Sequence, residues 1–260
     1  MSTRGWAVIL GASSGFGAAT ARRLAAEGYG IFGVHLDRRG AMPMVEALVE
    51  ELRGHDVPVH FVNGNAARDD TRAEMVAKLS EVAAGSQVAV LLHSLAFGTL
   101  RPYFDDGAAV IGRKHVEMTL DVMAHSLVYW AQDLVTAGLL REGGRVFAMT
   151  SSGSLAAWRA YGAVSAAKCA LEAHIRQLAV ELAPKGITAN AVMAGVTKTP
   201  ALDKIPGAEE IARRALERNP SGRLTEPDDV ARCIVALASA NTGWLTGNVL
   251  RVDGGESVAG

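Results

Sequence analysis

Short apolar runs and longer amphipathic stretches alternate along the whole chain, and this alternation limits the possible folds more than any other feature. The apolar runs have the pattern of strands buried on both faces: Trp6–Leu10, Ile31–Leu36, Val57–Val62, Val88–Leu92, Arg145–Thr150, Ile187–Met193 and Val249–Val252. The stretches between them have helical patterning: Phe16–Glu27, Met42–Arg53, Asp70–Ala84, His115–Leu140, Tyr161–Leu182, Glu209–Arg218 and Pro227–Ala238. Strands that alternate with helices in this way form a mostly parallel sheet covered on both sides. The sequence therefore predicts a single-domain, Rossmann-like doubly wound α/β fold with about seven strands.

Composition fits one ordinary globular domain and excludes several classes of partner. The chain has 260 residues, of which 49% are hydrophobic and 20% charged, with a net charge of -1. This charge gives no general attraction to nucleic acids or anionic membranes. No run approaches the roughly 18 apolar residues of a membrane span, and Trp6–Leu10 is too short for the core of a signal peptide. Two cysteines, Cys169 and Cys233, make neither a metal-ligand spacing nor a disulfide framework. We expect a cytoplasmic protein with no metal, nucleic-acid or membrane partner.

A glycine-rich turn directly follows the first predicted strand and opens the first predicted helix. It reads Gly11-Ala-Ser-Ser-Gly15-Phe-Gly17. Glycines there let the backbone approach a pyrophosphate, and the free N–H groups at the start of the helix bind negative charge. The candidate cofactor-binding residues of this turn are Gly11, Ser13, Ser14, Gly15, Phe16 and Gly17. A turn that serves chain geometry alone is the alternative.

Tyr161 and Lys168 stand seven residues apart in a run of small, helix-tolerant residues. At about 100° per residue, seven steps fall only about 20° short of two full helical turns, so both side chains lie on one stripe. A phenol there can donate a hydrogen bond to a substrate oxygen that becomes negative. A nearby ammonium lowers the pKa of the phenol and can hold a cofactor ribose. The alternative is a half-buried tyrosine beside a solvated lysine.

From Trp6 to its end, the chain resembles the short-chain dehydrogenase/reductase family. The glycine turn, the Tyr161/Lys168 helix, Pro227-Asp-Asp-Val230 and Val252-Asp-Gly-Gly255 occur in family order. The common branch of the family has tyrosine four residues before lysine, where this chain has Val164. The seven-residue step is similar to the divergent branch, the enoyl-acyl-carrier-protein reductases of type II fatty acid synthesis. This resemblance implies an NAD(P)H-dependent reductase.

Two further segments resemble the divergent branch. His93-Ser-Leu-Ala-Phe-Gly98 is similar to the His-Ser-x-Ala-Phe motif of the enoyl reductases. The resemblance implies that Ser94, Leu95 and Ala96 run along the cofactor, and it gives His93 no catalytic role. In the common branch a catalytic asparagine lies on the long central helix, and Met123 takes that place here. A proton relay through that asparagine is therefore absent.

Ser151 lies ten residues before Tyr161, where many enoyl reductases have a second aromatic residue. Ketone-reducing relatives have serine there, and so does a subgroup of enoyl reductases that the chain resembles. Its hydroxyl could donate a second hydrogen bond to a substrate carbonyl, so Ser151 joins Tyr161 and Lys168 as a catalytic candidate. A serine that only caps a strand end is the alternative.

The segment after the sixth predicted strand resembles the part of the family fold that closes over the cofactor. Thr197 and Thr199, in Gly195-Val-Thr-Lys-Thr199, are the cofactor contacts that this resemblance implies. Residues 197–220 would form a mobile substrate lid, and a plain surface helix is the alternative.

Cofactor choice depends on the end of the second strand, Val34-His-Leu-Asp-Arg-Arg39. An acidic residue there binds the adenosine ribose hydroxyls, whereas arginines bind the phosphate of NADPH. His35 takes the place of the usual acid, and Arg38 and Arg39 favour NADPH. Asp37, an acid two residues after His35, leaves NADH as the alternative cofactor. Asn65 and Ala66 match the pair of residues that contacts adenine in the family.

The resemblance implies reduction of the trans-2 double bond of an enoyl thioester, carried by acyl-carrier protein. Tyr161 would hydrogen-bond the thioester oxygen, and Lys168 would hold the nicotinamide ribose. One alternative is a carbonyl or 3-oxoacyl reductase, or an alcohol dehydrogenase, of the same family. Another is a nucleotide-binding regulatory or structural subunit, although such chains usually lose the tyrosine or the lysine. Relatives are mostly tetramers, so we expect a homotetramer.

Overall fold

The computed structural model, which describes residues 3–107 and 109–259, contains one sheet of seven parallel strands. The strands are β1 (Trp6–Leu10), β2 (Gly30–His35), β3 (Val59–Asn63), β4 (Val88–His93), β5 (Leu140–Ser151), β6 (Thr188–Ala194) and β7 (Val249–Val252). Their order across the sheet is β3-β2-β1-β4-β5-β6-β7, and all neighbours pair in parallel. The chain thus starts in the middle of the sheet and builds outward twice, which confirms the predicted doubly wound fold.

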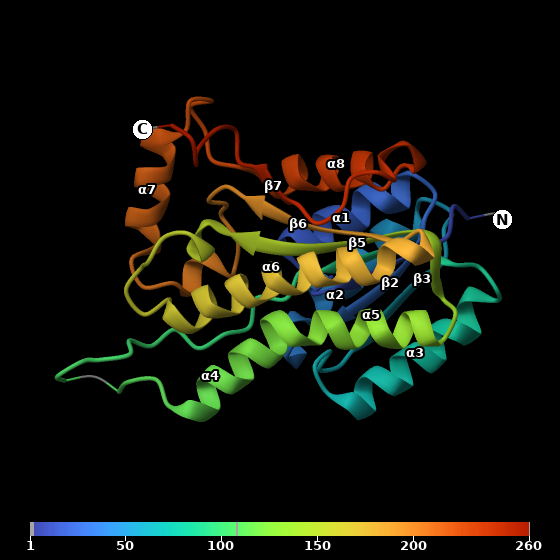
Figure 1. The fold of residues 1–260 in the computed structure, drawn as a ribbon, viewed down its shortest axis with the longest axis horizontal. Helices are drawn as coiled ribbons and strands as arrows, with labels where there is room; N and C mark the ends of the chain where they lie inside the picture. Colours follow the sequence, from blue (N-terminus) through green and yellow to red (C-terminus); the bar gives the residue numbers. More distant parts are fainter. Residues whose placement is uncertain (1–2, 108, 260) are drawn as a thin grey trace.

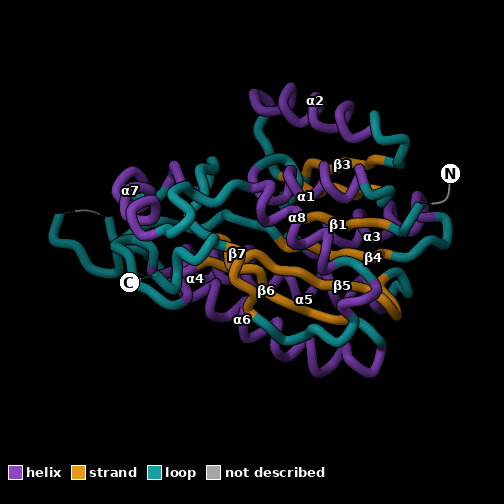
Figure 2. Tube along the Cα trace, turned by 90° about the horizontal axis from the view of Figure 1, so that it is seen from above, coloured by secondary structure: helices purple, strands orange, loops and turns teal. Residues whose placement is uncertain are grey.

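Helices cover both faces of this sheet (Figures 1 and 2). They are α1 (Gly15–Ala26), α2 (Met42–Arg53), α3 (Asp69–Ala83), α4 (Arg113–Leu120), α5 (Ser126–Thr136), α6 (Gly162–Leu182), α7 (Ala208–Arg218) and α8 (Pro227–Leu237). Buried side chains of α1, α2 and α8 pack on one face, and those of α3, α5 and α6 pack on the other. The arrowheads of β5 and β6 in Figure 1 point toward the end of the molecule that carries α7. Functional residues that follow the strands are therefore gathered at that end.

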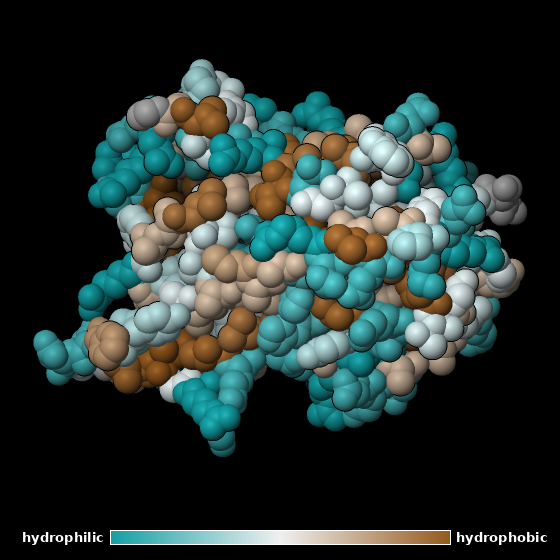
Figure 3. Space-filling model, viewed as in Figure 1, coloured by the Kyte–Doolittle hydropathy of each residue, from teal (hydrophilic) through white to brown (hydrophobic). Residues whose placement is uncertain are grey.

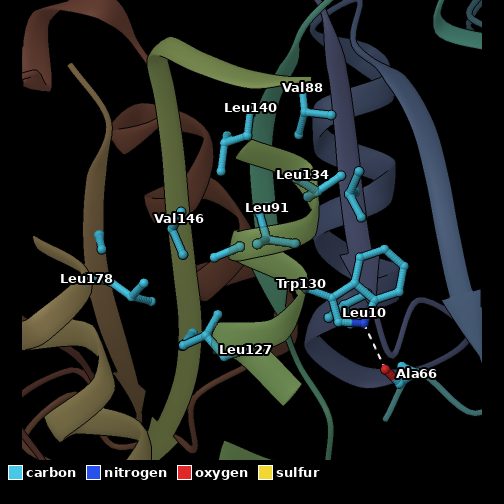
Figure 4. Packing of buried hydrophobic residues seen from close by; sticks show 14 of the residues in the cluster. Leu10, Ala66, Val88, Leu91, Leu127, Trp130, Leu134, Leu140, Val146 and Leu178 are labelled. Atoms are coloured by element: carbon cyan, nitrogen blue, oxygen red, sulfur yellow. Dashed lines mark hydrogen bonds between the residues drawn. The ribbon is translucent and has the colours of Figure 1, made fainter. Parts of the chain in front are cut away.

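The core beneath α5 and α6 supports the carboxyl ends of the strands, where the functional residues gather. Trp130 of α5 is fully buried among leucines and valines of β1, β4 and β5, as Figure 4 shows. Its indole N–H donates to the carbonyl of Ala66 at 2.8 Å. Burying an indole is favourable when its single polar group keeps a partner. This bond holds the turn after β3 against the core.

The long helix predicted from His115 to Leu140 differs from the structure. A π-helical turn, Asp121–His125, separates α4 from α5, and α5 ends at Thr136. Gly138 then takes a φ of 67°, and Leu140 pairs with Val88 as the first residue of β5. Leu140, the last residue of the predicted helix, is therefore buried in the sheet and not in a helix. The other helix boundaries lie within one residue of the prediction.

Among the described residues, none of the helices combines the length and the apolar character that crossing a membrane requires.

Candidate active site

A cavity of about 320 Å³ lies at the carboxyl ends of the strands. Its wall is formed by the turns that follow β1, β2, β3, β4 and β6, by the end of β5, and by side chains of α6. The strand order reverses between β1 and β4, and such reversals leave a crevice above a parallel sheet. We call this the first cavity.

The glycine turn forms one side of the first cavity. Gly11 has a φ of 88°, and a Cβ at that position would lie 2.4 Å from the carbonyl oxygen of Ser94. A Cβ at Gly17 would lie 2.1 Å from the carbonyl oxygen of Gly11. The first residue before α1, Ser14, makes no side-chain cap. The backbone is therefore tightly packed at the first turn of α1 and leaves its N–H groups without a side-chain cap, which suits a phosphate.

Tyr161 and Lys168 both line the first cavity, so the seven-residue step brings them to one place. Tyr161 immediately precedes α6, and Lys168 lies two turns into it. Lys168 is 5% exposed, and its ammonium donates to the carbonyl of Met149 at 2.8 Å. Burial lowers the pKa of Lys168 to about 8, and the negative charge of Glu172 partly opposes this effect. The ammonium is thus held at the cavity in an environment that only just keeps it charged at neutral pH.

Glu172 lies beneath Lys168 and was not among the residues that the sequence singled out. It follows Lys168 by one helical turn, and its Oε1 accepts a hydrogen bond from Thr150 Oγ1 at 2.6 Å. Thr150 is also part of the cavity wall. An acid four residues after a lysine on the same helix lies on the same face, and that spacing could have identified it.

The Tyr161 phenol lies beside Ser151 at the end of β5. Burial raises the pKa of Tyr161, and the Ser151 hydroxyl partly lowers it again. The phenol therefore stays protonated and is available as a donor. Ser151 Oγ also accepts from the N–H of Gly153 at 3.3 Å. Ser151 thus both lines the cavity and caps the end of its strand.

The position of the common-branch tyrosine is closed off by packing. Val164 is 4% exposed, and a Cβ added to Gly98 would meet Val164 Cγ2 at 2.7 Å and Met123 Sδ at 2.9 Å. Val164 therefore belongs to the core, whereas Met123 of the π-helical turn also reaches the first cavity. His93 is fully buried, and its Nε2 lies 2.9 Å from Ser126 Oγ. Burial lowers the pKa of His93 to about 3, so this histidine is neutral.

The turn after β2 places an acid, and not the arginines, in the wall. Asp37 lines the first cavity, and its Oδ2 lies 2.9 Å from Nδ1 of the buried His35. Asn63 holds the turn, because its amide donates to the carbonyl of Asp37 at 2.9 Å. Arg38 and Arg39 are exposed and lie outside the wall.

Most of the other predicted cofactor contacts also lie in the wall of the first cavity. They are Ser13, Ser14, Gly15, Phe16, Asn65, Ala66, Ser94, Leu95, Ala96 and Thr199. A methyl carbon of Thr199 comes within 3.6 Å of a Cβ built on Gly15. Thr197 instead turns inward, where its hydroxyl donates to the carbonyl of Gly195 at 2.9 Å. Gly17 and Thr197 therefore lie outside the wall of the first cavity.

A second cavity, of about 530 Å³, adjoins the first and shares Ser151 and Tyr161 with it. It lies between α7 and the segment that runs from Ser151 to Trp158. Residues 197–220, which the sequence predicted as a lid, contain helix α7 and form part of the wall of this second cavity. The two cavities join at Tyr161, so a molecule that occupied both would pass this residue.

Comparison with known proteins identifies the family of this chain. The family described as Enoyl-(Acyl carrier protein) reductase matches residues 11–257. A curated relative, (2S)-[(R)-hydroxy(phenyl)methyl]succinyl-CoA dehydrogenase subunit BbsD of Thauera aromatica, is 30% identical over 97% of this chain and 96% of its own length. The chain belongs to the short-chain dehydrogenase/reductase family. It is accordingly an NAD(P)-dependent oxidoreductase.

Two further proteins are similar to this chain. The 1-cyclohexenylcarbonyl-CoA reductase of Streptomyces collinus is 33% identical over 57% of this chain and 53% of its own length. The crystal structure of the NADH-dependent enoyl-[acyl-carrier-protein] reductase of Aquifex aeolicus VF5 superposes with a TM-score of 0.86. That comparison covers 99% of this chain and 98% of the other, at 23% identity, and it supports the fold alone.

Proposed function

We propose that this protein reduces the trans-2 double bond of an enoyl thioester, with the acyl group carried by acyl-carrier protein. The observation that carries the proposal is the joint position of Tyr161 and Lys168 on one cavity. Val164, the alternative position for a tyrosine, is buried in the core. The match to the enoyl reductase family and the similarity to a reductase of a cyclic enoyl-CoA support the same chemistry.

The cavity residues account for the charge that develops in this reaction. When bound, a reduced nicotinamide supplies the hydride that adds to the β-carbon. The electrons of the double bond then move toward the thioester carbonyl, whose oxygen becomes negative. Tyr161 donates a hydrogen bond to that oxygen, a role that typically contributes a few kcal/mol. The Lys168 ammonium holds the ribose and adds positive charge, and the α-carbon takes its proton from solvent.

The chain's own residues fit a dinucleotide along the first cavity. The turn from Gly11 to Gly17 would hold the pyrophosphate, and Thr199 would close over it. Asp37 would accept hydrogen bonds from the adenosine ribose. Because Asp37 lines the cavity while Arg38 and Arg39 lie outside it, we propose NADH as the preferred cofactor in place of the NADPH expected from the sequence.

Cofactor choice is tested with Asp37→Ala. The loss of an acceptor for both ribose hydroxyls should lower kcat/KM for NADH by about 10- to 100-fold, and that for NADPH much less. If Asp37→Ala left the ratio of kcat/KM for NADH to that for NADPH unchanged, or if the wild type preferred NADPH, the proposal of NADH would be wrong, and Arg38 and Arg39 would determine cofactor choice.

Ketone reduction is the second candidate, and Ser151 is the observation that favours it. Its hydroxyl lies at the phenol, as a second donor to a carbonyl would. The relative BbsD, whose name describes a dehydrogenase of a hydroxy compound, supports this second candidate.

An absorbance assay of cofactor oxidation separates the two candidates. We expect oxidation with crotonyl thioester and little with acetoacetyl thioester. Tyr161→Phe should lower kcat by about 100-fold or more, because it removes the oxyanion donor. Tyr103→Phe is the matched control, since Tyr103 packs against Gly162 beside the same helix start but lies outside both cavities. Activity with the ketoacyl substrate alone would replace the proposal by the second candidate.

A further inference from the structure

The second cavity is the place where the acyl group of the proposed substrate would lie. It meets the first cavity at Ser151 and Tyr161, so a thioester at the phenol directs its acyl chain under α7. Most of its wall is apolar. The main apolar contributors are Trp158, Val196, Leu202, Ile205, Ile211 and Ala215. The Trp158 ring is fixed there, because its N–H donates to the carbonyl of Pro206 at 2.9 Å.

A buried carboxyl group interrupts this apolar wall. Glu256, which follows the last strand, lines the second cavity and is only 4% exposed. One of its oxygens, Oε2, accepts a hydrogen bond from the N–H of Val196 at 2.9 Å. The absence of a side chain at Gly195 makes room for it, since a Cβ there would lie 2.8 Å from Oε2. The carboxyl group is thus held at a defined place in the wall.

The other oxygen of Glu256 is poorly satisfied by the protein. The ion pair that Oε1 makes is with Arg218 Nη2, at 4.0 Å, which is longer than a hydrogen bond. The Arg218 side chain is 53% exposed, so its charge lies mostly in water. Burial also raises the pKa of Glu256, because the low-polarity wall opposes its charge. An acyl group in the cavity would displace the water that reaches this oxygen. An acceptor left there without a donor is costly, and a donor on the ligand would offset that cost.

The charges around the cavity limit which donor fits. The wall contains two arginines, Arg214 and Arg218, and two glutamates, Glu217 and Glu256, so their charges nearly balance and give no net attraction to a charged ligand group. Arg214 is already paired with Glu210 at 2.5 Å and lies over the Trp158 ring. A neutral hydroxyl group loses less hydration free energy than a charged group on entering a mostly apolar cavity, and it can donate to Glu256 Oε1.

We propose that the second cavity selects enoyl thioesters whose acyl group carries a hydroxyl, and that Glu256 accepts the hydrogen bond from that hydroxyl. This inference rests on the proposed function. Polar groups placed in an otherwise apolar pocket are what fix a ligand's orientation and specificity. An unsubstituted acyl chain would instead cover the carboxyl group with methylenes and leave Oε1 unpaired.

The test compares enoyl thioesters of equal chain length with and without a terminal hydroxyl, across a series of chain lengths. For the wild type, kcat/KM should favour the best hydroxylated substrate over its unsubstituted match by about 10- to 100-fold. Glu256→Leu should remove or reverse that preference, and Glu256→Gln, which keeps an acceptor, should retain part of it. Glu217→Gln is the matched control, because this glutamate lines the same cavity but is exposed.

The outcomes separate this inference from the proposed function. If the wild type reduces both members of every pair equally, the inference is wrong and enoyl reduction stands. If neither is reduced, calorimetric binding of the saturated thioesters still tests the cavity: tighter binding of the hydroxylated form, lost in Glu256→Leu, would support it, and equal binding would overturn it. Thermal unfolding of each variant excludes a folding defect, and Glu256→Gln serves if Glu256→Leu does not fold.

Discussion

The protonation state of the buried Lys168 depends on the charges and the burial around it. It lies in the wall of the first cavity, donates to a strand carbonyl, and has Glu172 one turn below it. A buried amine loses charge more readily than a solvated one, because desolvation opposes the ammonium form. The negative charge of Glu172 raises the pKa of Lys168 and so favours its charged form.

The lowered pKa of Lys168 predicts a pH dependence. The pKa of Lys168 is lowered to about 8, so the ammonium is present below that pH and lost above it. The activity should therefore fall as pH rises through about 8. Glu172→Gln removes the opposing charge, and the fall should begin at a lower pH. The pH profile of kcat/KM, measured with saturating cofactor, checks both statements.

A conservative variant separates charge from packing in that experiment. Glu172→Asp keeps the charge and should move the profile back toward that of the wild type. If Glu172→Gln lowered the activity equally at every pH, its role would be structural, and our account of Lys168 would be wrong.

At the residue scale, the glycine turn and the family resemblance predicted many of the residues that line the first cavity. The helical spacing of Tyr161 and Lys168 was sufficient to place them together. Glu172 had the same kind of signal. Glu256 had none, because its burial depends on how the last turn packs against Gly195. The directions of Arg38 and Arg39 were equally unreadable, since exposed side chains on a turn have no periodicity to orient them.

Among the elements, the turn from β1 into α1 has the least tolerance for added atoms. Gly11→Ala would place a methyl group 2.4 Å from the carbonyl of Ser94, at a φ of 88°. We expect it to lower the free energy of unfolding by more than about 2 kcal/mol, because both clash and backbone strain act there. Cofactor affinity should fall as well. Chemical unfolding and a fluorescence titration with NADH measure the two effects.

Gly40→Ala provides the comparison for that variant. A Cβ at Gly40 meets no heavy atom within 4 Å. Its unfolding free energy and cofactor affinity should stay close to those of the wild type. Equal behaviour of the two variants would contradict the close approach of the glycine turn to β4.

Helix boundaries were predictable where caps and polar faces mark them, and less so where apolar residues continue into a strand. The helix α8 begins at Pro227, as the sequence indicated. The predicted helix over His115–Leu140 failed at its end because Leu140 is equally suited to a buried helix and to a central strand. The π-helical turn at Asp121–His125 had no sequence signal that we recognised.

At the scale of the whole molecule, the alternation of strand and helix patterns was enough to predict the fold. Each apolar run became a parallel strand, and the reversal between β1 and β4 placed the cavity. The alternation of strands and helices does not predict which apolar side chains stay on the surface.

The loop before α4 exposes four apolar side chains, those of Phe97, Tyr103, Phe104 and Val110. Figure 3 shows hydrophobic surface at that end of the molecule, at the lower left.

We propose that the protein is a homotetramer, and Trp244 offers a test. The Trp244 side chain is fully exposed in the single chain, and it lies just before β7, the strand at one edge of the sheet. Exposed apolar side chains beside a sheet edge mark surfaces that pair with other chains. Light scattering should give the mass of four chains for the wild type and a smaller mass for Trp244→Glu. Met44→Glu, which changes an exposed methionine of α2, should remain a tetramer; a single-chain mass for the wild type would refute the proposal.

The central claim is that hydride adds to the β-carbon of an enoyl thioester in the cavity that Tyr161 and Lys168 share. The most direct measurement uses NADH that carries deuterium at the transferred position, with crotonyl thioester as substrate, and locates the label by NMR. Our account predicts one deuterium at carbon 3 of butyryl thioester. Label found on the carbinol carbon of 3-hydroxybutyryl thioester, formed from acetoacetyl thioester while crotonyl thioester stays unchanged, would contradict it.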